Sequence, residues 1–307
     1  MTGRDVSIPW SLNLLIAAAQ VAALGVIMGA AGRVSVWWCA LVLAPLWGIV
    51  MNAVYSLIHE AEHNLFHPDP RVNDTAGVVL ALLFPAPFHL LRQGHLGHHV
   101  RNRSDDEAFD LYFPEDSRLW KFVQLYGILI GLYWAVVTLS SVVALVRPSL
   151  LRPDRVRFDR PTAALLESLN PRYEPWIRLE ALAIVLVHGA GLWLLAVPLT
   201  HYLIVLYGFG LSWSGFQYVH HFGTVRDVRR GARNLKTWPV LDAIWLNHNY
   251  HLNHHAHPTV PWIGVPALPA GPDGEPQSLV RAYLRMWRGP RLTTVRVQNR
   301  YAGFVIR

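Results

Sequence analysis

The chain has 307 residues, of which 52% are hydrophobic and 15% are charged, and its mean hydropathy is +0.25. These values exclude an ordinary soluble protein and favour a chain folded in a lipid bilayer. A net charge of +7 would suit nucleic acid, but the basic residues cluster beside apolar segments, which fits anionic headgroups instead. The single cysteine, Cys39, excludes a disulfide framework, a cysteine zinc site and an iron–sulfur ligand set.

Two long apolar segments begin the chain. Trp10–Ala31, about 22 residues, would rise roughly 33 Å as a helix, enough to cross the hydrocarbon core. We expect it to be a retained helix and not a removed signal peptide, because no small-residue cleavage site follows a short apolar core. Val34–Ile58 predicts a second span that continues without a breaker into His59. Pro68 and Pro70 are predicted to end that helix.

The middle of the chain sets the number of membrane crossings. Ala76–Leu91 is short and holds two prolines, which indicates a re-entrant or interfacial segment. Three longer apolar segments follow, and an odd number of crossings would separate the histidine-rich regions that flank them. Residues 147–178 are rich in arginine and belong on the cytoplasmic side by the positive-inside rule. Phe122–Val146 is therefore predicted not to cross, whereas Leu179–Val197 and His201–Val219 form a spanning hairpin.

Histidines recur in three short motifs outside the predicted spans. IHEAEH places two imidazoles at i and i+4, whereas GHLGHH and HLNHH each place three at i, i+3 and i+4. These spacings bring the rings onto one face of a helix, a geometry that suits a metal. A single histidine is as often a hydrogen-bonded interior or surface residue, but three such motifs in one membrane protein favour metal binding. The eight candidate ligands are His59, His63, His95, His98, His99, His251, His254 and His255.

The number and type of ligands limit the choice of metal. Neutral imidazoles suit iron, zinc, copper and nickel. A single zinc site needs three or four protein ligands, so this many histidines indicate two metals. Without thiolates, and at a membrane surface, two irons that activate oxygen are the most economical interpretation. A ninth ligand would be His220 or His221, which follow the last apolar segment.

The segments HEAEHNLFHPDPRVND, RQGHLGHHVRN and NHNYHLNHHAHPTVPW resemble, in the correct order, the three histidine boxes of the membrane fatty acid desaturase superfamily. The resemblance implies an all-α integral membrane protein of about four transmembrane helices plus re-entrant or interfacial helices, with a cytosolic histidine-rich cap. It also implies a non-haem di-iron centre, held by the box histidines, that uses O2 and reductant to attack an unactivated C–H bond. HFG is similar to the corresponding alkane monooxygenase segment and favours His221 over His220.

From this resemblance we expect residues 1–307 to form one desaturase-like domain in the inner (plasma) membrane, with the active site on the cytoplasmic face. Two branches of the superfamily are mixed in the motifs. GHHVR and HHAHP are similar to alkane monooxygenases, whereas HEAEH and the PTVPW after the third box are similar to desaturases. The favoured activity is desaturation of a lipid acyl or alkyl chain. Hydroxylation and oxidative decarboxylation are the alternatives within the superfamily.

Two other classes of protein share parts of this pattern. His59, Glu60 and His63 form His-Glu-x-x-His, the zinc-binding motif of metalloproteases, with Asp242 as a distant acidic candidate. That interpretation leaves six box histidines unexplained. A metal carrier or transporter would need polar residues inside the spans, which have almost none. His67 continues the i+4 series of the first box and is a weaker candidate ligand.

Polar residues outside the boxes suggest supporting roles. Asp105, Asp106 and Glu107 predict either a solvated loop or hydrogen bonds to ligand imidazoles. The chain has no dinucleotide-binding fingerprint and no haem motif, so electrons would come from a separate protein of ferredoxin, rubredoxin or cytochrome type. A basic run could dock an acidic donor or bind anionic headgroups. This run consists of Arg226, Arg229, Arg230, Arg233 and Lys236.

Overall fold

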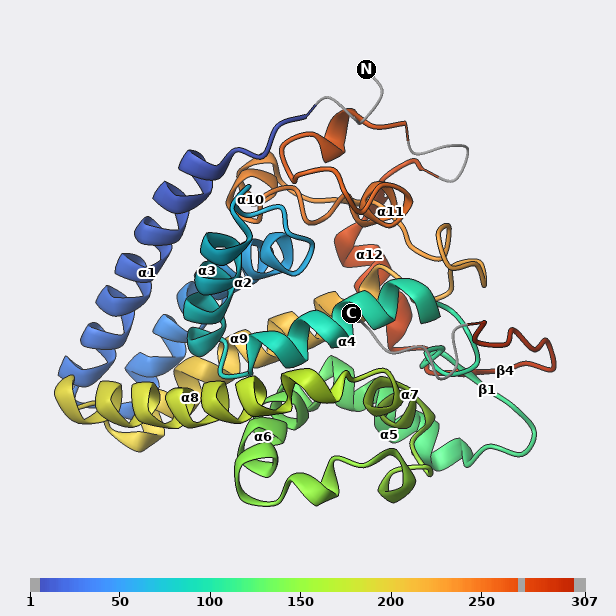
Figure 1. Cartoon of the computed structure of the whole chain (residues 1–307), viewed down its shortest axis with the longest axis horizontal. Coiled ribbons are helices and arrows are strands. Elements are labelled where there is room, and N and C mark those ends of the chain that lie inside the picture. The colour runs from blue at the N-terminus through green and yellow to red at the C-terminus, as the bar shows by residue number, and fades with distance from the viewer. Residues whose placement is uncertain (1–5, 270–273, 301–307) are drawn as a thin grey trace.

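The computed structural model describes residues 6–269 and 274–300, and its regular structure is almost entirely helical (Figure 1). The helices are α1 (Trp10–Arg33), α2 (Trp37–Glu62), α3 (Pro70–Leu83), α4 (Phe88–Arg101), α5 (Arg118–Leu129), α6 (Leu132–Val146), α7 (Arg160–Glu167), α8 (Glu174–Leu194), α9 (Leu199–Val219), α10 (Pro239–Ile244), α11 (His251–Ala256) and α12 (Leu279–Met286). The strands are β1 (Leu111–Tyr112), β2 (Leu235–Lys236), β3 (Gln277–Ser278) and β4 (Arg291–Leu292), and they pair in parallel as β1 with β4 and β2 with β3.

Three helical segments are long and apolar enough to cross a membrane, namely α1, α2 and residues Pro171–Leu194, which include α8. Two bent pairs meet the same criterion as broken spans or re-entrant loops: α3 with α4, bent by 101°, and α5 with α6, bent by 90°. The described residues therefore hold three to five candidate spans. This confirms the predicted all-α membrane fold with about four spans and re-entrant segments.

Helix α9 was predicted to span but is not among those three segments, although it has 21 residues. It packs in the interior along α2, where its polar side chains find partners. Asn52 Nδ2 of α2 donates to Ser212 Oγ of α9 at 2.9 Å. A β-carbon at Gly208 would lie 2.5 Å from the carbonyl oxygen of Ala44, so the two backbones touch. The crossing of the bilayer by α9 stays a prediction.

The helix that carries the first box ends earlier than predicted. Helix α2 stops at Glu62, with His63 at its C-cap, and the prolines that follow do not terminate it. Pro70 instead begins α3, where a residue without an N–H loses no intrahelical hydrogen bond. The N-cap of α3 is Asp69, whose carboxylate accepts from Arg71 N at 2.8 Å. Helix α3 therefore connects the first box, at the end of α2, with the second box, on α4.

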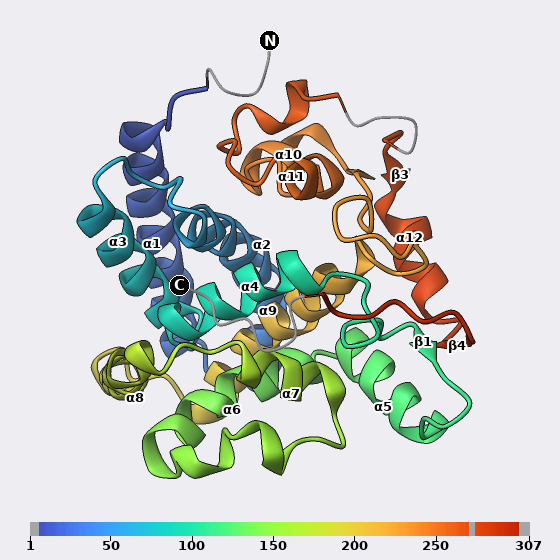
Figure 2. The same ribbon diagram turned by 45° about the vertical axis from the view of Figure 1, so that its right-hand side comes forward.

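The segment Phe122–Val146 is divided at Gly131, which has a φ of +84° and separates α5 from α6. A side chain at this position would be strained, and its β-carbon would lie 3.0 Å from Leu211 N. The 90° bend makes this segment either a broken span or a re-entrant loop, so its predicted failure to cross stays a prediction. Figures 1 and 2 show α10, α11 and α12 on one side of the long helices.

Candidate metal centre

Four helices that are far apart in the sequence bring the histidines together. The first box lies at the C-terminal end of α2, the second on α4 and the third on α11, and His221 follows the end of α9. Among the described residues, two groups have potential ligand atoms that all lie within 4.8 Å of one another. The five-histidine group is His59, His63, His95, His99 and His254, and the four-histidine group is His98, His221, His251 and His255.

The second and third boxes are each divided between the two groups. In the second box, His95 and His99, at i and i+4, join the five-histidine group, whereas His98, at i+3, joins the other. The third box is divided in the opposite sense, because its i+3 residue, His254, belongs to the five-histidine group. All nine histidines that the sequence singles out as ligands are therefore assembled in one place.

The distances between ring nitrogens fit metal binding. His63 Nε2 lies 2.8 Å from His95 Nε2, and His221 Nε2 lies 3.1 Å from His251 Nε2. These are the separations of neighbouring ligands that each stand about 2.1 Å from one ion. His59 Nε2 is buried and has no hydrogen-bond partner among the described residues, as expected for a nitrogen whose partner is a cation. The donor set thus suits two metal ions.

Hydrogen bonds on the far side of two rings set their tautomers. His98 Nδ1 lies 2.7 Å from Glu107 Oε2, and His221 Nδ1 lies 2.8 Å from Gly231 O. Each Nδ1–H donates to an acceptor, which leaves the Nε2 lone pair for the centre. Of the predicted acids, Glu107 therefore contacts a candidate ligand, whereas Asp105 pairs with the basic run through an arginine 2.5 Å away.

The third box is kept uncharged by its surroundings. Burial, followed by the neighbouring imidazoles, holds the pKa of His254 and His255 well below the ordinary value for histidine. A neutral imidazole retains the lone pair that a metal needs. The position of the α11 histidines and their neutral state are therefore both suited to metal binding.

The structure leaves several nearby histidines outside both groups. His220 Nδ1 donates to Arg233 O at 3.3 Å, although the His220 ring centroid is only 4.5 Å from that of His251. His67 accepts from Asp69 N at 2.9 Å and packs against the ring of Trp10. His248 lies next to His59, with ring centroids 4.9 Å apart. The arrangement thus selects His221 over His220 for the four-histidine group.

The metalloprotease motif does not form its own site. Glu60 Oε2 accepts from Trp262 N at 3.1 Å and so holds the segment after the third box against α2. Asp242 instead hydrogen bonds with Thr237 Oγ1. Neither carboxylate belongs to either histidine group, and three further histidines from the second and third boxes surround His59 and His63.

Two supporting elements were not predicted from the sequence. Asn234 Oδ1 accepts from Leu252 N at 3.1 Å and from Asn253 N at 3.3 Å, which satisfies the free N–H groups at the start of α11. Arg103 and Asp110 form a buried ion pair with a 2.5 Å contact. Asp110 also accepts from Gly223 N at 2.7 Å, just after the ninth candidate ligand. No sequence motif marks these residues, and the contacts of Asn234 with α11 and of Asp110 with Gly223 join positions that are distant in the chain.

The basic run is not a uniform surface. Arg226 donates to Asp105, and Arg233 is buried and donates to the carbonyl oxygen of Phe222. Arg229 and Lys236 are exposed. Arg226 and Arg233 therefore stabilise the loop between α9 and α10 and are not free to dock a partner.

The fold and the site define a helical membrane protein with two all-histidine groups that could each hold a metal ion. Residues 35–294 match the family model described as "Fatty acid desaturase", and the chain belongs to this family. The match spans all three boxes and His221. No curated protein matches the chain. Membership places the protein in a superfamily of membrane oxidoreductases that act on lipids and use two irons.

Proposed function

We propose that the nine grouped histidines hold two iron ions and that the protein uses O2 to desaturate a lipid acyl or alkyl chain. The observation that supports this most is the division of nine imidazoles into two adjacent groups without a thiolate or carboxylate member. When bound, the irons would supply the activation of oxygen that an unreactive C–H bond requires. Hydroxylation is the second candidate, favoured by the alkane monooxygenase-like motifs GHHVR and HHAHP.

The chain's own residues prepare this site in two ways. Burial keeps the imidazoles of α11 neutral and excludes water from them. Glu107 and the backbone carbonyl of Gly231 each hold the proton on the far nitrogen of a ligand ring. The first effect keeps the lone pairs available for metal, and the second fixes the orientation of two ligand rings before substrate arrives.

We further propose that the site faces the cytoplasm of the inner (plasma) membrane and that residues 1–307 act as one domain. The arginine-rich residues 147–178 support this orientation. Electrons would come from a separate carrier protein of ferredoxin, rubredoxin or cytochrome type. Arg229 and Lys236 are exposed near the site and could attract an acidic carrier.

Metal analysis and lipid analysis together test this proposal. We expect the purified protein to hold close to two irons and little zinc, and His251→Ala to lose iron. His67→Ala is the matched control, because this histidine lies outside both groups. Mass spectrometry of lipids and free hydrocarbons from cells with and without the gene would show a new double bond, or a hydroxyl group for the second candidate. One zinc per chain, with peptide cleavage that depends on Glu60, would overturn the proposal.

A further inference from the structure

An apolar groove follows the seam between α2 and α9 and is flanked by α12. Its volume is about 480 Å³, within the range of about 300 to 1,000 Å³ typical of ligand sites. Pro45 and Ile49 of α2, Leu211 and Phe216 of α9, and Leu284 of α12 line it. The groove runs beside the apolar part of α2, a candidate span, so a lipid chain could reach it from the bilayer.

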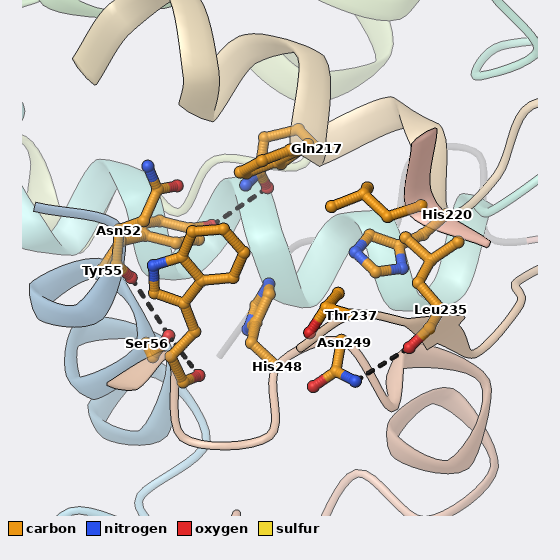
Figure 3. Close-up of a pocket in the computed structure, with 12 residues that line it drawn as sticks. Asn52, Tyr55, Ser56, Gln217, His220, Leu235, Thr237, His248 and Asn249 are labelled. Atoms are coloured by element: carbon orange, nitrogen blue, oxygen red, sulfur yellow. Dashed lines mark hydrogen bonds between the residues drawn. The ribbon is translucent and has the colours of Figure 1, made fainter. Parts of the chain in front are cut away.

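A second, smaller cavity shares four lining residues with this groove, and His220 and His248 lie on its wall (Figure 3). Asn52, Phe216, Trp245 and Leu279 line both spaces and so lie between them. Trp245 is fixed there, because its indole nitrogen donates to a backbone carbonyl of α2 at 3.2 Å and its own carbonyl oxygen accepts from a serine hydroxyl of α2 at 2.9 Å. The inner cavity is much smaller than the groove, with a volume of about 30 Å³.

The inner cavity lies against both histidine groups. His248 and His220 form part of its wall. The ring centroid of His248 is 4.9 Å from that of His59 in the five-histidine group, and the centroid of His220 is 4.5 Å from that of His251 in the four-histidine group. A molecule that fills the groove and the inner cavity would therefore have one end next to the proposed metal site.

The chemistry of the inner cavity differs from that of the groove. Its described lining includes Tyr55, Gln217, Thr237 and Asn249 but no lysine, arginine, aspartate or glutamate. Such a surface binds an uncharged polar group, since a buried charge without a partner is strongly unfavourable. The narrow volume also excludes a bulky headgroup.

A residue that lines the inner cavity has a buried polar atom without a hydrogen-bond partner among the described residues. Asn249 is only 7% exposed, and its Nδ2 donates to Leu235 O at 2.8 Å (Figure 3). Its Oδ1 is buried and has no partner among the described residues. Because a buried acceptor is nearly always paired, this oxygen calls for a donor on the ligand.

Resting on the proposed function, we infer that the substrate is a single-chain lipid with a small uncharged head that donates a hydrogen bond, such as a primary alcohol or a primary amide. The head lies in the inner cavity against Asn249 Oδ1, and the chain passes Trp245 into the groove. This placement keeps the lipid in the orientation it has in its leaflet, with its head toward the histidine cap. The C–H bonds presented to the site are those near the head.

Binding to the full-length protein prepared without metal tests this inference separately from any oxidation. The probe is radiolabelled hexadecanol in a scintillation proximity assay, with unlabelled hexadecanamide, hexadecanoate and hexadecane as competitors. We expect hexadecanol and hexadecanamide to bind about tenfold or more tightly than the other two, because only they satisfy the buried acceptor without burying a charge. Asn249→Leu should abolish this preference and leave the affinity for hexadecane unchanged, which also shows that the variant is folded.

A second pair of variants tests the groove. Leu211→Trp should fill it and weaken the binding of all four compounds, whereas Leu15→Trp, on the exposed face of α1, should change none of them. Equal affinity for hexadecanoate and hexadecanol, or a preference that survives Asn249→Leu, would overturn the inference. If hexadecanol failed to bind while lipid oxidation in cells still required His251, the head-group inference would fail and the proposed function would stand. If hexadecanol bound selectively but the protein as purified held no iron, the head-group inference would stand and the proposed function would fail.

Discussion

The contact between Glu107 and His98 provides a sharp test of the proposed metal site. Glu107 is 11% exposed, and its Oε2 accepts from His98 Nδ1 at 2.7 Å while its Oε1 accepts from Arg101 Nε at 3.0 Å. Burial alone would raise the pKa of Glu107, but Arg101 and His98 lower it below its ordinary value, so the group is a carboxylate at neutral pH. Glu107→Leu removes this acceptor while leaving all nine candidate ligands in place.

Loss of an acceptor behind a ligand imidazole typically weakens metal binding by about 10- to 100-fold, or about 1.4 to 2.7 kcal/mol. We expect Glu107→Leu to fall in this range and Glu107→Gln to lose less, because the amide oxygen can still accept from Nδ1–H. The effect should be confined to the four-histidine group, to which His98 belongs. The variant should therefore lose one iron before the other.

Iron retained per chain, measured against increasing concentrations of a ferrous chelator, reports this difference. Asp106→Asn is the matched control, since it removes a charge from the same acidic run without touching the His98 contact. The reasoning is refuted if Glu107→Leu releases iron at the same chelator concentration as the wild type, or if the control releases it as readily.

Three further predictions concern stability, topology and electron transfer. Asp110→Asn should lower stability by about 3 to 5 kcal/mol, because it leaves Arg103 buried without its partner; thermal unfolding in detergent would measure this. Burial raises the pKa of Asp110 but Arg103 lowers it further, so this stabilisation should be present above the ordinary aspartate pKa and disappear as pH falls through the depressed value; a flat acid profile would contradict this. An impermeant thiol reagent added outside cells should not label cysteines introduced within residues 147–178, and labelling there would refute the topology. Charge reversal at Arg229 and Lys236 should slow reduction by an acidic donor at low salt with iron content unchanged, and unchanged rates would assign these residues to the membrane.

The fold was predictable where local sequence decides it. Apolar length identified the segments that became α1, α2 and α8. Where long-range contacts decide, prediction was weaker: α9 is not among the three candidate spans and packs along α2, and Pro70 begins a helix although prolines also end them. The break at Gly131 depends on the backbone of α9 passing close by, which no local pattern shows.

The site was predictable to the extent that it is periodic. The i, i+3, i+4 spacing identified the box histidines, and the position of HFG after a predicted helix favoured His221 over His220. The residues that position these rings were harder to find. Asn234 caps α11 from a loop 17 residues earlier, and one acid of three in the run at 105–107 reaches a ligand. Such roles depend on which atoms the fold brings together and leave no pattern in the sequence.

The division of the second and third boxes between the two groups follows from helix geometry. With about 100° per residue, i and i+4 differ by roughly 40° around the axis, whereas i+3 lies roughly 60° to the other side of i. A His-x-x-His-His helix between two ions therefore gives two rings to one and one ring to the other. Helices α4 and α11 do this in opposite senses, so together they give three rings to each group. The first box adds two to one group and His221 adds one to the other, which makes five and four.

This geometry predicts that proximity in sequence and membership in a group are unrelated. His98 and His99 are adjacent but belong to different groups, whereas His98 and His255 are far apart in the chain and share one. In the iron-loaded protein, His98→Ala and His255→Ala should alter the same component of the Mössbauer spectrum, and His99→Ala should alter the other. The effects of substituting two residues that bind the same ion should not be additive. The double variant at positions 98 and 255 should therefore lose little more iron than either single variant. The double variant at positions 98 and 99 should lose both irons. If the adjacent pair behaved as one unit instead, each box would serve its own ion, and the assignment of the two groups would be wrong.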